Sequence, residues 1–318
     1  MDILQKEKKL DALINELHRL DDEAAIQSIK QNIENYKQKA MRSLSAWDRV
    51  LLARHQDRPN AKMVIEGVFD DFIELHGDRA YEDDKAIIGG IGLLNHQAIT
   101  IIAQQKGKTT EENIACNFAM PHPEGYRKAL RLMKQAEKFN RPIITIIDTP
   151  GAYPGLGAEA RGQGEAIAKN LFTMSDLKVP IITLILGEGG SGGALAIGMG
   201  NQVLMLENSI YSILSPEGYA SILWKDSSRS KEAAEAMKLT AYDLEEIGII
   251  DDIISEPLGG AHRDKAQTFE SIKNKLSEIL DDYQAMSQFE IQQERYKKYR
   301  SIGFFQRFNY ENLKGVVK

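Results

Sequence analysis

The sequence of 318 residues predicts an α/β fold with helices added at both ends. Three observations lead to this class. Residues 1–58 contain neither Gly nor Pro, so nothing in their composition interrupts a helix. From residue 142 onward, short apolar runs that are typical of buried parallel strands alternate with helical patterns. A long helical pattern at 263–283 then follows the last of these strands.

The first 58 residues predict a helical arm. Apolar residues recur every three or four positions in two runs, at 10–20 and 26–36. Asp21 and Asp22 lie between the runs and suit a turn before a new helix. We expect this arm at 1–58 to serve packing or assembly, followed by a core at 59–262 and a C-terminal helical region at 263–318.

The core begins with a helical pattern at 62–76 and then changes its period. Two apolar runs at 86–94 and 98–103, joined by Asn95-His96-Gln97, predict a β-hairpin. Further helices are expected at 124–140, 158–174, 193–199, 216–224, 230–237 and 263–283. Strands are expected at 142–148, 180–186, 202–207, 210–214 and 249–254. This alternation indicates a largely parallel sheet between layers of helices.

Composition excludes several classes of protein. Lys and Arg number 40 against 46 Asp and Glu, so a formal charge of −6 argues against general binding to nucleic acid or to an anionic membrane. The single cysteine, Cys116, excludes a disulfide framework and a multi-cysteine zinc site within the chain. No apolar stretch approaches the ~18 residues of a membrane span. We therefore expect a cytoplasmic protein that carries no metal of its own.

Glycine is concentrated in one part of the core. Twelve of the 25 glycines lie between residues 151 and 200. Most belong to two turns, 148–155 and 187–194, each directly after an apolar strand. Ligands of open α/β sheets bind at the carboxyl ends of the strands. The two turns are therefore expected to face one crevice.

The second turn matches two short motifs. Gly187-x-Gly189-x-x-Gly192, with Glu207 twenty residues after the first glycine, has the form of a dinucleotide fingerprint. The following helix is too short for that fold. Gly189-Gly190-Ser191-Gly192-Gly193 also has the form of a nucleophile elbow. A hydrolase would then need His262 with one of three acids, Asp226, Asp243 or Asp251.

A third interpretation is an oxyanion hole made of main-chain amides. Consecutive glycines let backbone N–H groups approach a carbonyl oxygen closely, and such donors stabilise the negative charge that develops on it. This site needs neither a nucleophile nor a histidine, and it suits enolates of acyl thioesters.

Longer stretches carry a resemblance to a known family. Residues 148–157 (DTPGAYPGLG) and 187–198 (GEGGSGGALAIG) resemble the α subunit of bacterial acetyl-CoA carboxylase carboxyltransferase. The similarity covers nearly the whole chain, and further motifs occur in the family's order at 47–50, 74–79, 104–107, 123–133, 215–218, 223–225 and 256–262. These composite motifs are far more specific than the short glycine patterns. The resemblance implies a crotonase-type, ClpP-like spiral fold.

The resemblance also implies a reaction and its partners. The family transfers a carboxyl group from carboxybiotin, on a biotin carboxyl carrier protein, to acetyl-CoA, which forms malonyl-CoA for fatty-acid synthesis. The active site lies between the α subunit and a β subunit with a four-cysteine zinc ribbon, in an α2β2 assembly. Biotin carboxylase completes the ATP-dependent complex. The lone Cys116 fits this division, because this chain cannot build the ribbon.

By the same resemblance, particular residues take roles in the site. The amides expected to stabilise the ureido oxygen of biotin are those of Gly192, Gly193 and Ala194, with Gly151 and Ala152 as a second donor. Residues expected to line the biotin channel are Tyr153, Gly190, Ser191 and Trp224.

The chain departs from the family pattern in two places. The family usually has a basic residue before its Asn-Phe pair and a glycine after it, whereas this chain has Ala115, Cys116 and Ala119 around Asn117-Phe118. Ala160 replaces the second Glu of a pair. Neither change touches the glycine turns.

Two other functions remain open at this point. A non-catalytic scaffolding subunit would suit the helical arms. A stand-alone crotonase-type hydratase or isomerase would need a carboxylate over the thioester, for which Glu159, Glu188 and Glu217 are the candidates.

Overall fold

The computed structural model describes residues 3–20, 22–41 and 43–303. Within these residues a single sheet of eight strands forms the centre of the molecule. The strands are β1 (Asp70–Glu74), β2 (Ile87–Leu94), β3 (Gln97–Gln104), β4 (Ile143–Thr149), β5 (Ile181–Gly190), β6 (Gln202–Leu206), β7 (Ile210–Ser212) and β8 (Asp252–Ile254).

The sheet is antiparallel at one edge and parallel elsewhere. The strand order is β1-β2-β3-β4-β5-β6-β8, and β7 pairs with the end of β5. β1, β2 and β3 form an antiparallel meander, and all later pairs are parallel. The predicted hairpin is confirmed, with Asn95 and His96 both at positive φ in its turn. Because β3, β4 and β5 are mutually parallel, their carboxyl ends meet at one edge of the sheet.

Helices surround the sheet and extend from it. The N-terminal helices are α1 (Ile3–Leu17), α2 (Glu23–Met41), α3 (Ala46–Ala53) and α4 (Ala61–Val68). The helices of the core are α5 (Thr110–Ala115), η1 (Asn117–Ala119), α6 (Pro123–Lys138), α7 (Leu156–Ala160), α8 (Gln163–Asp176), α9 (Ser191–Leu195), α10 (Pro216–Trp224), η2 (Ser227–Arg229), α11 (Ser230–Met237) and α12 (Ala241–Glu246). The last two are α13 (Lys265–Tyr283) and α14 (Gln288–Ser301).

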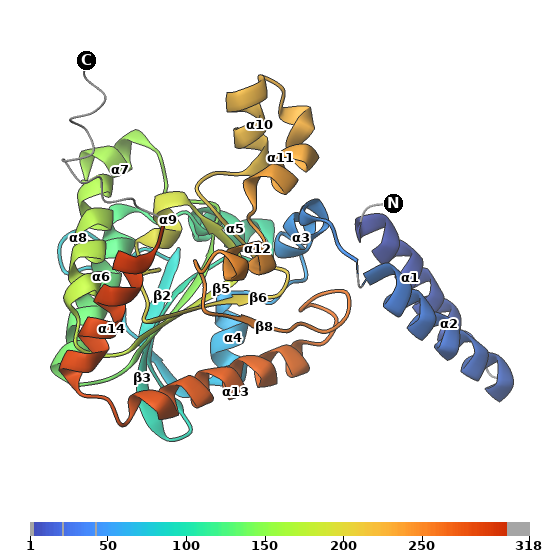
Figure 1. Cartoon of the computed structure of the whole chain (residues 1–318), viewed down its shortest axis with the longest axis horizontal. Coiled ribbons are helices and arrows are strands. Elements are labelled where there is room, and N and C mark those ends of the chain that lie inside the picture. The colour runs from blue at the N-terminus through green and yellow to red at the C-terminus, as the bar shows by residue number, and fades with distance from the viewer. Residues whose placement is uncertain (1–2, 21, 42, 304–318) are drawn as a thin grey trace, which may run out of the picture.

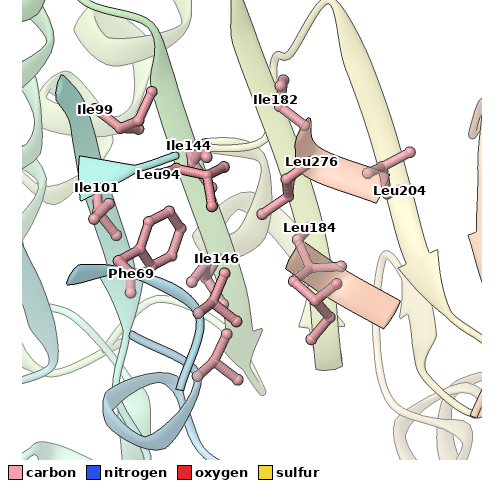
Figure 2. Packing of buried hydrophobic residues seen from close by; sticks show 14 of the residues in the cluster. Phe69, Leu94, Ile99, Ile101, Ile144, Ile146, Ile182, Leu184, Leu204 and Leu276 are labelled. Atoms are coloured by element: carbon pink, nitrogen blue, oxygen red, sulfur yellow. The ribbon is translucent and has the colours of Figure 1, made fainter. Parts of the chain in front are cut away.

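The central strands are buried on both faces, as their continuous apolar sequences predict. On one face, Ile144, Ile146 and Leu184 form a cluster with residues of α4 and α13. Phe69, at the end of α4, and Leu276 of α13 belong to this cluster (Figure 2). The intervening residues of the same strands pack on the other face, against α6 and α8. This two-layer covering fixes the register of β4 and β5, and thus the positions of the loops that follow them.

The N-terminal arm projects from the core as a helical hairpin of α1 and α2 (Figure 1). Its root is fixed by Glu7, which is buried and accepts from His262 Nε2 at 2.7 Å. Burial opposes ionisation of Glu7, but bonds to His262 and His55 outweigh it and hold the pKa of Glu7 well below its usual range. None of the described helices is both long enough and apolar enough to span a membrane.

Several predicted elements differ in the structure, and the strands expected at 210–214 and 249–254 are shortened to β7 and β8. The helix expected at 62–76 ends at Val68, because the next residues form β1 and pair with β2. The helix expected at 158–174 is divided into α7 and α8 at Gly162, whose φ of 83° is left-handed. The helix expected at 193–199 begins at Ser191 and ends at Leu195. Of the predicted C-terminal helical region, residues 304–318 lie outside the described part of the chain.

Candidate active site

The two glycine turns lie in direct main-chain contact. A Cβ added to Gly193 would lie 2.4 Å from the nitrogen of Ala152 and 2.5 Å from the carbonyl carbon of Gly151. A Cβ added to Gly190 would lie 2.1 Å from the carbonyl oxygen of Pro150. Both contacts are with backbone, which cannot rotate away as a side chain can. Glycine is therefore required at both positions for the turns to approach this closely.

The short helix α9 presents main-chain donors at this junction. It begins immediately after β5, with Ser191 at a left-handed φ of 52°. The first amides of any helix have no acceptor within the helix, and in α9 these include Gly192, Gly193 and Ala194. Buried amides without an acceptor are costly unless a ligand or water accepts from them. The arrangement therefore suits an oxygen that carries negative charge.

The amides of Gly151 and Ala152, the two candidate donors of the first turn, differ in whether they already donate a hydrogen bond. The amide of Gly151 donates to Thr149 Oγ1 at 3.0 Å, so it is already engaged. No described residue accepts a hydrogen bond from the amide of Ala152, which lies against Gly193. Of this pair, Ala152 is thus the better placed to donate to a ligand.

An apolar cleft opens beside the N-terminus of α9. Its volume is about 670 Å³, and Ser191 and Gly192 form part of its wall. The rest of the wall comes from the end of α9 and from β7, α10, α11, α12 and the residues that follow them. These residues are Leu195, Tyr211, Ser212, Ile213, Tyr219, Ala236, Met237, Lys238, Leu244, Ile247 and Ile249. Apolar walls with a few polar groups at one end are typical of small-molecule sites.

The predicted channel residues occupy different places. Ser191 lines the cleft, while Gly190 lies behind it against Pro150. Tyr153 is outside the cleft lining, and its ring lies 4.6 Å from that of His122. Trp224 is also outside the cleft lining. It contacts Tyr219, which is part of the wall, edge to face, with 5.7 Å between the ring centroids.

A network of charged side chains lies at the start of the glycine turns. Lys106 Nζ lies 2.7 Å from Asp148 Oδ1 and 3.0 Å from Glu188 Oε2. Arg54 contacts Glu188 at 2.7 Å and Glu217 at 2.8 Å. Burial raises the pKa of Glu188, but the charges of Lys106 and Arg54 outweigh burial and lower the pKa to about 2. Glu188 is thus held ionised, and the ion pairs hold the side chains of both Asp148 and Glu188 in place.

The geometry does not support a serine hydrolase or a dinucleotide site. His262 bonds to Glu7 at the root of the arm, whereas Asp226, Asp243 and Asp251 bond to Ser228, Thr240 and Val203 respectively. No described acid therefore orients this histidine toward Ser191. Glu207 is engaged by Tyr242 and by the amide of Glu256, and α9 has only five residues.

Several site residues were missed from the sequence. Gln104 and Tyr126 both donate to the carbonyl of Gly193, and Tyr219 forms a wall of the cleft. One signal was available for Gln104, because it is a polar residue at the carboxyl end of an apolar strand, where sites form. Nothing local distinguishes Tyr126 from the other apolar-face residues of its helix.

Solved structures of similar architecture define the class of fold. A transcarboxylase 12S with bound methylmalonyl-CoA matches 69% of this chain and 43% of its own, at a TM-score of 0.55 and 21% identity. A Pseudomonas malonate decarboxylase heterodimer matches 69% of this chain and 89% of its own, at a TM-score of 0.55 and 16% identity. The chain thus spans less than half the length of the transcarboxylase chain. The predicted crotonase/ClpP-like fold is confirmed.

The family follows from closer relatives. A family model described as acetyl co-enzyme A carboxylase carboxyltransferase-like matches residues 1–303. A Staphylococcus carnosus acetyl-coenzyme A carboxylase carboxyl transferase subunit alpha is 56% identical over 305 residues, which cover 95% of this chain and 97% of that protein. The protein of the same name from Staphylococcus aureus MRSA252 is 57% identical over 286 residues, which cover 90% of this chain and 91% of that protein. The chain belongs to this carboxyltransferase family, as its motifs predict.

Proposed function

We propose that this chain is the α subunit of an acetyl-CoA carboxylase carboxyltransferase, which moves a carboxyl group from carboxybiotin to acetyl-CoA and forms malonyl-CoA. The observation that carries the proposal is the pairing of unengaged main-chain amides with an apolar cleft at the junction of two strand-end turns. The relatives named for this activity share 56–57% of their residues with the chain.

The main-chain amides bind and orient the ureido oxygen of biotin. We assign this role to Gly192, Gly193 and Ala194, with Ala152 opposite them, and the apolar cleft wall is suited to a fused hydrocarbon-rich ring. When bound, biotin supplies the carboxyl group and a basic ureido group. The chain's amides stabilise negative charge on the oxygen, and removal of one such donor typically costs about 2.7–4 kcal/mol of transition-state stabilisation. The apolar walls exclude water and strengthen these bonds.

A side-chain base is absent from the proposed chemistry. Glu188 and Glu217 are both held by Arg54, so neither is poised to take a proton from a substrate. Glu159 is exposed on α7 and outside the residues that line the cleft. The positions of these three carboxylates disfavour a stand-alone hydratase or isomerase. In the proposed reaction the ureido group of biotin, and not a side chain, accepts the proton of acetyl-CoA.

A β subunit completes the site in this proposal. Large apolar side chains near the cleft are exposed, among them Ile213 at 78% and Ile222 at 63%. Leu156, at 86%, lies just after the first glycine turn. Burial of such side chains favours a protein partner. We propose an α2β2 assembly in which β carries zinc and holds the thioester, and which works with a biotin carboxyl carrier protein and biotin carboxylase in the cytoplasm.

The test is reconstitution of the reverse reaction. The chain is mixed with a zinc-ribbon β subunit, free biotin and malonyl-CoA, and formation of acetyl-CoA is followed. Turnover that needs both subunits and biotin supports the proposal. Turnover by this chain alone, or a well-assembled mixture without turnover, contradicts it.

A further inference from the structure

The carbonyl of Gly193 is held by side chains from outside its own helix. Gln104 Nε2, from the end of β3, donates to it at 2.8 Å, and the hydroxyl of Tyr126 approaches at 3.5 Å. Both residues are fully buried. Helix α9 ends at Leu195, and the amide of Ile197 donates to Ala194 instead. Gln104 therefore replaces the helical donor that the Gly193 carbonyl lacks.

This bond acts on the next amide along the chain. In a planar trans peptide the C=O and the following N–H point in opposite directions. A donor that fixes the Gly193 carbonyl therefore also fixes the direction of the Ala194 N–H. Hydrogen bonds in series polarise one another, so the same contact makes the Ala194 N–H a stronger donor.

We propose that Gln104 is a positioning residue for carboxyl transfer, because its amide holds the Gly193–Ala194 peptide so that the Ala194 N–H faces the oxyanion. The proposal rests on the function proposed above. Gln104 acts through the peptide and does not touch the substrate.

The burial of Gln104 supports a role beyond stability. Its Oε1 is buried and has no hydrogen-bond partner within the described residues. A buried polar atom without a partner costs about 1–3 kcal/mol, whereas an apolar residue of similar size would avoid that cost. The residues that precede Gln104 in β3, such as Ile102 and Ala103, are apolar, so the strand itself does not require an amide.

The test replaces the amide by a side chain of similar length that cannot donate. Gln104→Met keeps an unbranched chain that fills the same space. In the reconstituted reverse reaction we expect kcat to fall about tenfold to a hundredfold, as is common when a residue that orients a reacting group is removed. The KM for biotin should stay within about twofold, because the loss is in the transition state. Gln97→Met, at the other end of the same strand and partly buried, is the matched control and should keep both constants.

Assembly with the β subunit is checked by size-exclusion chromatography before the rates are compared. If Gln104→Met does not assemble, Gln104→Leu provides the second test, since leucine is also apolar and carries no hydrogen-bond donor. An assembled variant of either kind with wild-type kcat, or one whose loss lies wholly in KM, overturns the proposal. A wild-type mixture that does not turn over refutes the proposed function instead, so the two failures are distinct.

Discussion

The two sides of the glycine turns use different chemistry. On the cleft side, donors come from the main chain, and the surrounding wall is largely apolar. On the charged side, which lines a separate pocket that shares no lining residue with the cleft, Lys106, Arg54, Asp148 and Glu188 form ion pairs at 2.7–3.0 Å. The same two turns therefore adjoin both a crevice with few charges and a densely charged region.

This difference indicates how negative charge that develops on a substrate oxygen can be stabilised mainly by main-chain dipoles, which cost no reorganisation during reaction. Lys238 in the cleft wall is exposed and pairs with Asp243 at 3.2 Å, so its charge is already balanced. The ion pairs instead hold the start of each turn, through Asp148 and Glu188. We infer that side-chain charge provides rigidity and main-chain dipoles provide catalysis.

The largest expected effect is on the charged side. Lys106→Met removes the cation shared by Asp148 and Glu188, which are 3% and 9% exposed. Loss of one partner from a buried ion pair leaves charge uncompensated, and we expect the free energy of unfolding to fall by about 3–5 kcal/mol. Urea denaturation of wild type and Lys106→Met at pH 7 measures this difference in the free energy of unfolding.

Lys62→Met is the matched control for that change. Lys62 pairs with Glu66 at 4.0 Å on an exposed helix surface, and its loss should change the free energy of unfolding by less than about 0.5 kcal/mol. Equal effects of the two variants would show that the charged side does not support the turns.

The next effect is on the cleft side. Gly193→Ala places a methyl group against the backbone of Gly151 and Ala152, so the two turns must separate. If one donor is lost, kcat in the reconstituted reaction falls by a factor that corresponds to about 2.7–4 kcal/mol. Gly164→Ala, in α8, has no atom within 4 Å of the added Cβ and should leave kcat unchanged. Normal turnover by assembled Gly193→Ala would favour a scaffolding role for this subunit.

The third effect follows from the ionisation of Glu188 in the charged network. The folded-state pKa of Glu188 is about 2, below the ~4.3 of an unfolded glutamate. Its ionised form therefore contributes stability above about pH 4.5, and this contribution of about 2–3 kcal/mol is lost as the pH falls toward 2. The unfolding free energies of wild type and Glu188→Gln should differ by that amount at pH 7 and converge only as the pH falls to about 2.

Glu165→Gln is the control for the acid experiment. Glu165 is exposed and pairs with Lys169 at 3.5 Å, four residues along the same helix. Its difference from wild type should be small at every pH. A constant difference between Glu188→Gln and wild type across the acid range would contradict the stated pKa.

Most of the fold could be predicted because its signals are local. The uninterrupted apolar runs of β4 and β5 and the Asn95-His96 turn are each contained in a few consecutive residues. β1 was not predicted, because its residues continue the helical spacing of α4 and become a strand only by pairing with β2. Gly162 divides a helix that its neighbours favour, since glycine adopts the left-handed conformation without strain.

The site could be predicted only in part, for a similar reason. The glycine turns are visible as a sequence pattern, but the engagement of Gly151 by Thr149 depends on the shape of one turn. Gln104 is 89 residues from Gly193 and meets it only because β3 and β5 lie on either side of β4. No sequence pattern reports such a contact.

The smallest effect concerns the helices that wall the cleft. Lys225 ends α10 at a left-handed φ of 58°, and its amide donates to the carbonyl of Ala220. An L-residue is strained there, whereas glycine is the usual residue at this position. Lys225 is exposed and outside the cleft lining, so Lys225→Gly should raise the free energy of unfolding by about 0.5–1 kcal/mol. Lys231→Gly, inside α11, should lower it by a similar amount. Thermal denaturation of both variants measures the two signs, and a destabilised Lys225→Gly would show that the cleft wall depends on that side chain and not on backbone conformation.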